Sequence, residues 1–241
     1  MTDQSHESEP HEGEQHEGGL SARLNALRAG VLGANDGIVS TAGIVIGVAA
    51  ATTSRAAIAT AGLAGLAAGA MSMAVGEYVS VSTQRDTERA MVAREIRELR
   101  EQPAEELAEL TGLYADRGLS PDLARQVAEQ LTAHDALAAH AEVELGIDPD
   151  DLANPWHAAF ASMGSFTVGA SLPVVAILLS AQSWRVPVTV VAVLLALVLT
   201  GWASATVGRS PVPRAVVRNL AGGALAMAIT YAVGRFVGAH I

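Results

Sequence analysis

Residues 29–51 read AGVLGANDGIVSTAGIVIGVAAA, and the carboxylate of Asp36 is their one charged side chain. The length of this stretch approaches the ~20 residues that an α-helix needs to cross the hydrocarbon core of a bilayer. Gly33 and Gly37 flank the Asn35–Asp36 pair and allow a neighbouring helix to come close. A charge in hydrocarbon costs at least ~2.5–3.5 kcal/mol, so we expect Asp36 to serve a function.

Four further apolar stretches of similar length follow, and Glu77 is the one acidic residue in them. They run over residues 57–81, 158–181, 186–207 and 216–237. Half of the chain is hydrophobic although aromatic residues make up only 4 %, and abundant small residues suit close helix packing in lipid. We therefore predict an all-α polytopic membrane protein with five transmembrane helices. The chain has no cysteine, which excludes disulfides and thiolate metal sites.

The acidic charge is concentrated between the second and third apolar stretches. The net charge is −10, and residues 85–151 alone hold 17 acidic residues and seven arginines. Such a segment attracts cations and repels nucleic acid, so no nucleic-acid partner is expected. Pro103 and the Ser120–Pro121 pair are typical of helix starts. The segment therefore predicts a three-helix domain whose first helix continues the second membrane helix. Its third helix is expected to bury Leu123, Val127, Leu131 and Leu145.

The N-terminal region is polar and has neither the basic start nor the apolar core of a signal peptide. We expect it to be a disordered tail, in which His6, His11 and His16 could hold metal weakly. Four regions follow from these patterns: the tail over 1–20, transmembrane helices 1–2 over 21–84, the acidic helical domain over 85–151, and transmembrane helices 3–5 over 152–241.

Arginine placement predicts the orientation in the membrane, because loops on the cytoplasmic side carry the excess of basic residues. With the N-terminus inside, three arginines face outward, namely Arg55, Arg185 and Arg235. The inner ends then carry Arg23, Arg28, Arg85, Arg89, Arg94, Arg209, Arg214 and Arg218. This orientation makes the acidic domain cytoplasmic and leaves the C-terminus outside. Trp156 and Trp184 stand at predicted helix ends, as interfacial aromatic residues do.

Pairs of potential metal ligands lie on the expected faces of the acidic domain's helices. These pairs are Glu95 with Glu98, Glu106 with Glu109, and His140 with Glu144. Residues three or four apart share one helix face, so each pair is close enough to bind one cation. Carboxylates with an imidazole suit Fe²⁺, Mn²⁺ or Zn²⁺ better than Cu⁺. The alternative for each pair is a solvated helix face that pairs with Arg94, Arg97 or Arg100.

A catalytic di-iron centre of the ferritin kind is disfavoured by the same segment. Such a centre needs Glu-x-x-His motifs on facing helices. The residues three positions before His134 and His140 are Leu131 and Leu137, so the motif is missing. We expect no enzymatic activity and no permanent cofactor.

Within the membrane, three side chains are candidates for a translocation path: Asp36, Met73 and Glu77. Met73 lies one helical turn before Glu77, so both face the same way, and its thioether suits a late first-row ion. For Met73 the alternative is ordinary packing, and for Asp36 it is a hydrogen-bonded structural carboxylate. Five helices are few to enclose a path, whereas a two-fold homodimer would double both carboxylates around one axis.

Two segments resemble signatures of the vacuolar iron transporter family, also called the calcium-sensitive cross-complementer family. They are GANDGIVST at residues 33–41 and MSMAVGEYVS at residues 71–80, and the resemblance covers residues 20–240. It implies a five-helix homodimer with a cytoplasmic metal-binding domain. The family's first-helix aspartate falls on Asp36 and its second-helix methionine on Met73. Its metal-domain glutamates fall on Glu95, Glu98, Glu106, Glu109 and Glu144. A plant relative has a methionine pair where this chain has His140 and Ala141.

Members of that family move Fe²⁺, and often Mn²⁺, out of the cytosol in exchange for protons. The resemblance thus implies a proton-coupled transporter of Fe²⁺ and Mn²⁺. Zn²⁺ or Co²⁺ are further ions that the soluble domain could bind. The compact loops favour a prokaryotic plasma membrane as its location. The alternative function is a membrane-anchored metal sensor or store without transport, for which Asp36 would be dispensable.

Overall fold

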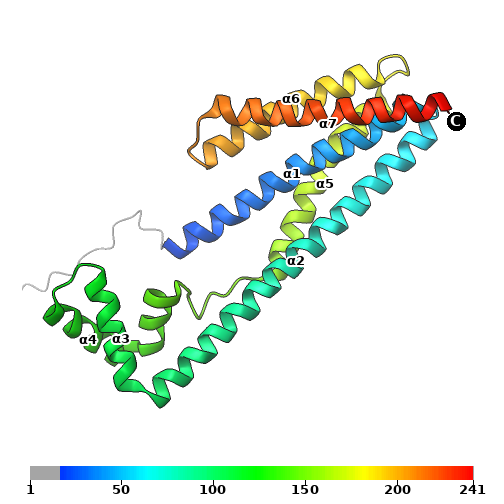
Figure 1. Ribbon diagram of the computed structural model, residues 1–241. Coiled ribbons are helices and arrows are strands. Elements are labelled where there is room, and N and C mark those ends of the chain that lie inside the picture. Colours follow the sequence, from blue (N-terminus) through cyan, green and yellow to red (C-terminus); the bar gives the residue numbers. More distant parts are fainter. Residues whose placement is uncertain (1–16, 241) are drawn as a thin grey trace, which may run out of the picture. The chain divides into compact units, whose positions relative to one another are not determined.

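The computed structural model describes residues 17–240 and, from residue 30 onward, their side chains. The predicted tail over residues 1–20, with His6, His11 and His16, lies mostly outside this range. Over the described residues the chain is helical, with no strand (Figure 1). The elements are α1 (Glu17–Ala51), α2 (Arg55–Glu101), α3 (Pro103–Asp116), α4 (Pro121–His140), the π-helix η1 (Ala141–Leu145), α5 (Pro155–Leu179), α6 (Arg185–Val207) and α7 (Val212–His240).

Among the described residues, five helices are long and apolar enough to cross a membrane, which confirms the predicted number. They are α1 from Gly30 onward, α2, α5, α6 and α7. α2 has 47 residues and is about 70 Å long, more than twice the ~30 Å hydrocarbon core. Its part from Arg85 onward is densely charged, so the membrane-spanning part of α2 is the apolar half that precedes it.

The chain forms two compact units. The first, called unit 1, combines the residues up to Ala70 with those from Gly164 onward, and the second, called unit 2, consists of Met71–Met163. α2 and α5 each contribute residues to both units. Unit 1 contains Asp36, and unit 2 contains Met73, Glu77 and the acidic segment.

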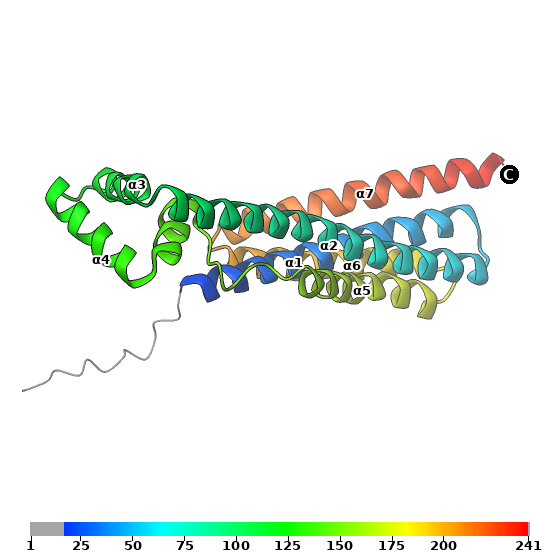
Figure 2. The same cartoon turned by 90° about the horizontal axis from the view of Figure 1, so that it is seen from below.

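In unit 1, helices α1, α6 and α7 run side by side (Figures 1 and 2). Their apolar faces meet the unit 1 parts of α2 and α5 in one core. Ile46 of α1, Ile58 of α2, Ile177 of α5 and Leu197 of α6 are all at most 1 % exposed. The apolar stretches that the sequence predicts as membrane helices therefore also supply the interior of this unit.

Small residues bring α1 and α5 into close contact. A Cβ atom at Gly37 would lie 2.9 Å from the backbone nitrogen of Ala170, and closer still to the carbonyl oxygen of Phe166. A Cβ at Gly169 would collide with the carbonyl of Ala34. The backbones of the two helices pack directly against each other, as small residues permit in membrane proteins.

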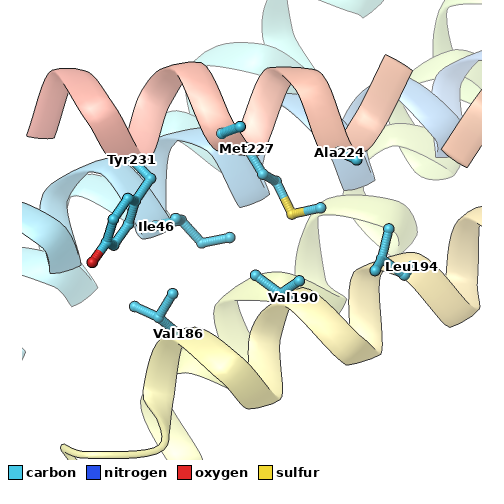
Figure 3. A pocket seen from close by; sticks show the side chains of 8 residues that line it. Ile46, Val186, Val190, Leu194, Ala224, Met227 and Tyr231 are labelled. Carbon is cyan, nitrogen blue, oxygen red and sulfur yellow. The ribbon is translucent and has the colours of Figure 1, made fainter. Parts of the chain in front are cut away.

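An apolar pocket of about 280 Å³ lies between α1, α6 and α7 in unit 1 (Figure 3). Val186, Val190 and Leu194 of α6 face Met227 and Tyr231 of α7 across it. Apart from the Tyr231 hydroxyl and the Met227 thioether, its lining consists of aliphatic side chains and the aromatic ring of Tyr231. This lining does not suit a divalent cation, which needs oxygen or nitrogen ligands.

In unit 2, α3 and α4 pack against each other and against η1. Their core contains Leu110, Ala128 and Ala139, all buried. The expectation that Leu123 is buried is wrong, because this side chain is 47 % exposed. α4 turns Ala124 and Ala128 inward instead, and these small side chains let it approach its neighbours more closely than a leucine would.

Gly37→Ala is expected to destabilise the protein, because the added methyl group meets fixed backbone of α5. Overpacking of this kind costs roughly 1–3 kcal/mol. Gly222→Ala on α7 is the matched control, since a Cβ there meets nothing within 4 Å. Thermal unfolding in detergent should show a lower midpoint for Gly37→Ala and an unchanged or slightly higher one for Gly222→Ala. Equal midpoints would contradict the close α1–α5 packing.

Candidate metal centre

Four of the six predicted metal-binding side chains come together in unit 2. Glu95 lies on the charged half of α2, Glu106 in the first turn of α3, His140 at the end of α4 and Glu144 on η1. The α2–α3 junction at Gln102–Pro103 brings the two glutamate-bearing helices together. The candidate ligands therefore come from four consecutive elements, α2, α3, α4 and η1, which place them next to one another.

Two irregularities place His140 and Glu144. The backbone of α4 is extended at Asp135, and the Asp135 carboxylate accepts a 3.0 Å hydrogen bond from the Ala138 N–H. Asp135 thus acts as an N-cap for the short helical segment that ends at His140. The chain then continues as a π-helical turn, and Gly146, with φ of +64°, ends it in the left-handed conformation.

The role of Asp135 was not predicted from the sequence. The signal that could have revealed it is an aspartate within a segment that is otherwise patterned as one helix, because aspartate is a preferred N-cap residue and marks the start of a helix. The end of α3 also supports the site, since the Arg117 guanidinium donates a 2.9 Å hydrogen bond to the carbonyl of Val143 on η1. Asp135 and Arg117 together hold the turn that carries Glu144.

The imidazole of His140 is at the centre of the cluster. Its Nδ1 atom lies 3.1 Å from a Glu95 oxygen, 3.6 Å from a Glu106 oxygen and 3.9 Å from a Glu144 oxygen. The ligand atoms of Glu95, His140 and Glu144 all lie within 4.8 Å of one another. Two ligand atoms ~2.1 Å from one ion are ~3.0–3.4 Å apart at octahedral or tetrahedral angles, which is close to the two shorter distances.

Three of the four side chains are buried, whereas Glu144 is exposed at the edge of the cluster. His140 is fully buried, and Glu95 and Glu106 are 3 % and 7 % exposed. Both ring nitrogens of His140 and one Glu95 oxygen are buried without a hydrogen-bond partner, since their mutual approaches lack hydrogen-bond geometry. Buried polar atoms are rarely left in this state, and a neutral imidazole nitrogen beside carboxylate oxygens fits the ligand set of a divalent cation.

Burial changes the charge state of these groups. Burial, together with the charges of Glu144 and Glu106, raises the pKa of Glu95 to about 7. Burial, followed by the charge of Glu109, also raises the pKa of Glu106. Burial lowers the pKa of His140, against the opposing effect of the Glu144 charge. The imidazole is therefore neutral near pH 7 and has a lone pair for a metal ion.

The other two predicted ligands lie differently. Both carboxylate oxygens of Glu98 accept hydrogen bonds from Nε of Arg94, at 2.9 and 3.1 Å. Glu98 is thus paired with Arg94 on the same helix face, which is the alternative to metal binding that the sequence left open. Glu109 lies one turn after Glu106 on α3 and is exposed, so it acts on the cluster through its charge.

The three predicted path residues lie on two different helices. Asp36 is on α1 and its side chain is exposed on unit 1, which leaves a carboxylate on the surface of a membrane-spanning helix. Met73 and Glu77 are half-buried on α2. Beside Glu77, Tyr78 packs on Trp156 of α5 with 4.7 Å between the ring centroids, and Trp156 stacks on Phe160.

Five apolar helices and a buried carboxylate–imidazole cluster define a multi-pass membrane protein with a candidate metal centre. Residues 27–235 match the VIT family. This match and the similarity to curated relatives show that the chain belongs to the VIT family, a family of transporters.

Three relatives illustrate this similarity. A vacuolar iron transporter of Acanthamoeba castellanii is 44 % identical over 86 % of this chain and 77 % of its own length. Vacuolar iron transporter homolog 4 of Arabidopsis thaliana is 36 % identical over 91 % of this chain and 88 % of its own length. Vacuolar iron transporter homolog 1 of Oryza sativa is 38 % identical over 91 % of this chain and 77 % of its own length. The family resemblance seen in the sequence is thereby confirmed.

Glu95→Gln is expected to raise the unfolding temperature of the metal-free protein by a few degrees at pH 8. A carboxyl whose pKa is higher in the folded than in the unfolded chain contributes stability below the unfolded value, and this contribution is lost as the pH rises through the folded value, here about 7. At pH 5 the difference should shrink, because Glu95 then already carries a proton.

Thermal unfolding with a chelator at both pH values measures this difference. Glu142→Gln, at an exposed position on the same π-helical turn as Glu144, is the control and should leave the midpoint unchanged at both pH values. A Glu95→Gln effect of the same size at pH 5 and pH 8 would contradict the raised pKa of Glu95.

Proposed function

We propose that this protein moves Fe²⁺ and Mn²⁺ out of the cytosol in exchange for protons. The observation that carries the proposal is the cluster of the buried Glu95, Glu106 and His140 with the more exposed Glu144, in which the ring nitrogens of His140 are buried without a geometric hydrogen-bond partner. Membership of a transporter family and the names of the relatives, vacuolar iron transporters, support iron as a cargo. The oxygen and nitrogen ligands suit both ions.

In this proposal unit 2 collects ions on the cytoplasmic side, as the arginine distribution favours. Glu95 is on the same continuous helix as Glu77 and Met73, so the metal centre and the inner part of the path are joined by rigid backbone. Glu109 adds negative charge near the centre, and so does Glu98, although Arg94 partly offsets the charge of Glu98. An acidic surface of this kind raises the local concentration of cations.

Asp36 is proposed to exchange a cation for a proton within the membrane. A carboxylate can bind either one, and a nearby cation favours its ionised form. Its exposure on α1 also supports a homodimer, because an unpaired carboxylate facing lipid is costly and a second copy would cover it. The location proposed from the sequence is a prokaryotic plasma membrane, whereas the relatives are named as vacuolar proteins.

His140→Ala is expected to lower the affinity for Mn²⁺ by roughly 10–100-fold or more, because the imidazole is the central ligand. The spectroscopic signal of free Mn²⁺, titrated against detergent-purified protein, measures this affinity. Glu142→Gln is the control, since the exposed Glu142 is on the neighbouring π-helical turn outside the cluster. Equal Mn²⁺ affinities for His140→Ala and wild type would overturn the proposed centre.

Asp36→Asn is expected to abolish Fe²⁺ flux while leaving Mn²⁺ binding by unit 2 intact. Proteoliposomes that report internal pH and internal iron measure the flux and its coupling to protons. Asp122→Asn, at an exposed position on α4, should behave like wild type. Flux at the wild-type rate in Asp36→Asn would rule out its central role. Metal binding without any flux in the wild type would instead indicate the sensor or store.

A further inference from the structure

Three polar side chains link three membrane-spanning helices of unit 1 at the level of Asp36. The amide oxygen of Asn35 on α1 accepts hydrogen bonds from the Thr200 hydroxyl of α6, at 3.3 Å, and from the Asn219 amide of α7, at 3.2 Å. The Asn219 amide also donates a hydrogen bond of 3.5 Å to the Thr200 hydroxyl oxygen. We call these residues the Asn35 triad, and all three are half-buried.

The Thr200 hydroxyl lies equally close, at 3.3 Å, to the Leu197 carbonyl of its own helix, whereas two other hydroxyl groups of α6 bond within that helix alone. Thr189 on α6 donates to the Arg185 carbonyl at 2.7 Å, and Thr206 donates to the Trp202 carbonyl at 2.9 Å. Such bonds stay within one helix and fix nothing between helices. The Asn35 triad, by contrast, connects three helices. It therefore specifies the rotation of α1 about its own axis and its position along α6 and α7.

The opposite side of α1 is fixed by close packing on α5. Consecutive residues of an α-helix point about 100° apart, so Asn35, Asp36 and Gly37 face three directions. Asn35 is bonded to α6 and α7, and Gly37 is packed on the backbone of Phe166 and Ala170. Asp36 lies between these two attachments, with its side chain exposed. The direction of its carboxylate is therefore set on both sides.

We propose that Thr200 and Asn219 are positioning residues for Asp36, acting through Asn35. A rotation of α1 by one residue, or a shift by one turn, would break both bonds to Asn35 and redirect the carboxylate. This inference rests on the proposed function, in which Asp36 exchanges a cation for a proton. Hydrogen bonds between membrane helices contribute little to stability, so their loss acts on transport more than on folding.

Thr200→Val tests the proposal because it removes the hydroxyl and keeps the shape. We expect kcat for Fe²⁺ flux in proteoliposomes to fall on the order of tenfold to hundredfold, as misplaced reacting groups do in enzymes. The pH profile of flux should shift, while the Mn²⁺ affinity of unit 2 stays unchanged. Thr200→Ser keeps the hydroxyl and should restore flux. Thr189→Val, which removes a hydroxyl bonded within α6, should resemble wild type.

A second measurement does not depend on transport. The chain has no cysteine, so Asp36→Cys provides a single thiol at the position in question. The rate at which a water-soluble thiol reagent labels it should change several-fold when Thr200→Val is added, and should not change with Thr189→Val.

These two readouts separate the possible failures. If wild type transports Fe²⁺ and Thr200→Val transports it equally well, the positioning role is wrong. If wild type transports no metal, the proposed function fails, and the labelling rates alone decide on the triad. Equal labelling rates of Asp36→Cys with and without Thr200→Val would then overturn the positioning role of the triad.

Discussion

Burial of the Glu95 and Glu106 carboxylates beside the His140 imidazole is the interaction around which unit 2 is organised, and both ring nitrogens and one Glu95 oxygen have no hydrogen-bond partner there. Separating anions from water is costly, and one route to relief is protonation, which is favoured because burial and the neighbouring carboxylates raise the pKa of Glu95 to about 7. A divalent cation is the other route, because it supplies the missing partner to His140 and the carboxylates together. The capped kink at Asp135 and the π-helical turn bring the ligands to this point.

Unit 1 differs from unit 2 because the apolar, membrane-spanning parts of its helices carry one carboxylate, that of Asp36. Asp36 is not enclosed by ligands from its own unit but is exposed between two attachments of α1. In the proposed function, the candidate metal centre of unit 2 captures the ion with a fixed ligand set, whereas the exposed Asp36 binds and releases it. A transport cycle requires both properties, because an ion that is only held tightly cannot be passed on.

The sequence predicted the helices well because their signals are local. Apolar stretches of membrane-spanning length and the helix-start prolines Pro103 and Pro121 depend on neighbouring residues alone. The burial of Leu123 was predicted wrongly, because the rotation of α4 depends on what packs against it. Residue spacing paired possible ligands along each helix, but it could not show that Glu98 bonds to Arg94 or that Thr200 reaches Asn35. Such contacts depend on tertiary arrangement.

X-ray absorption of Fe²⁺ bound to the purified protein, compared between wild type and His140→Ala, shows whether the imidazole is a ligand. We expect a wild-type shell of carboxylate oxygens and one imidazole nitrogen at ~2.0–2.2 Å, without sulfur, and loss of the imidazole contribution in His140→Ala. A sulfur ligand, or identical spectra for the two proteins, would contradict a metal centre built around His140.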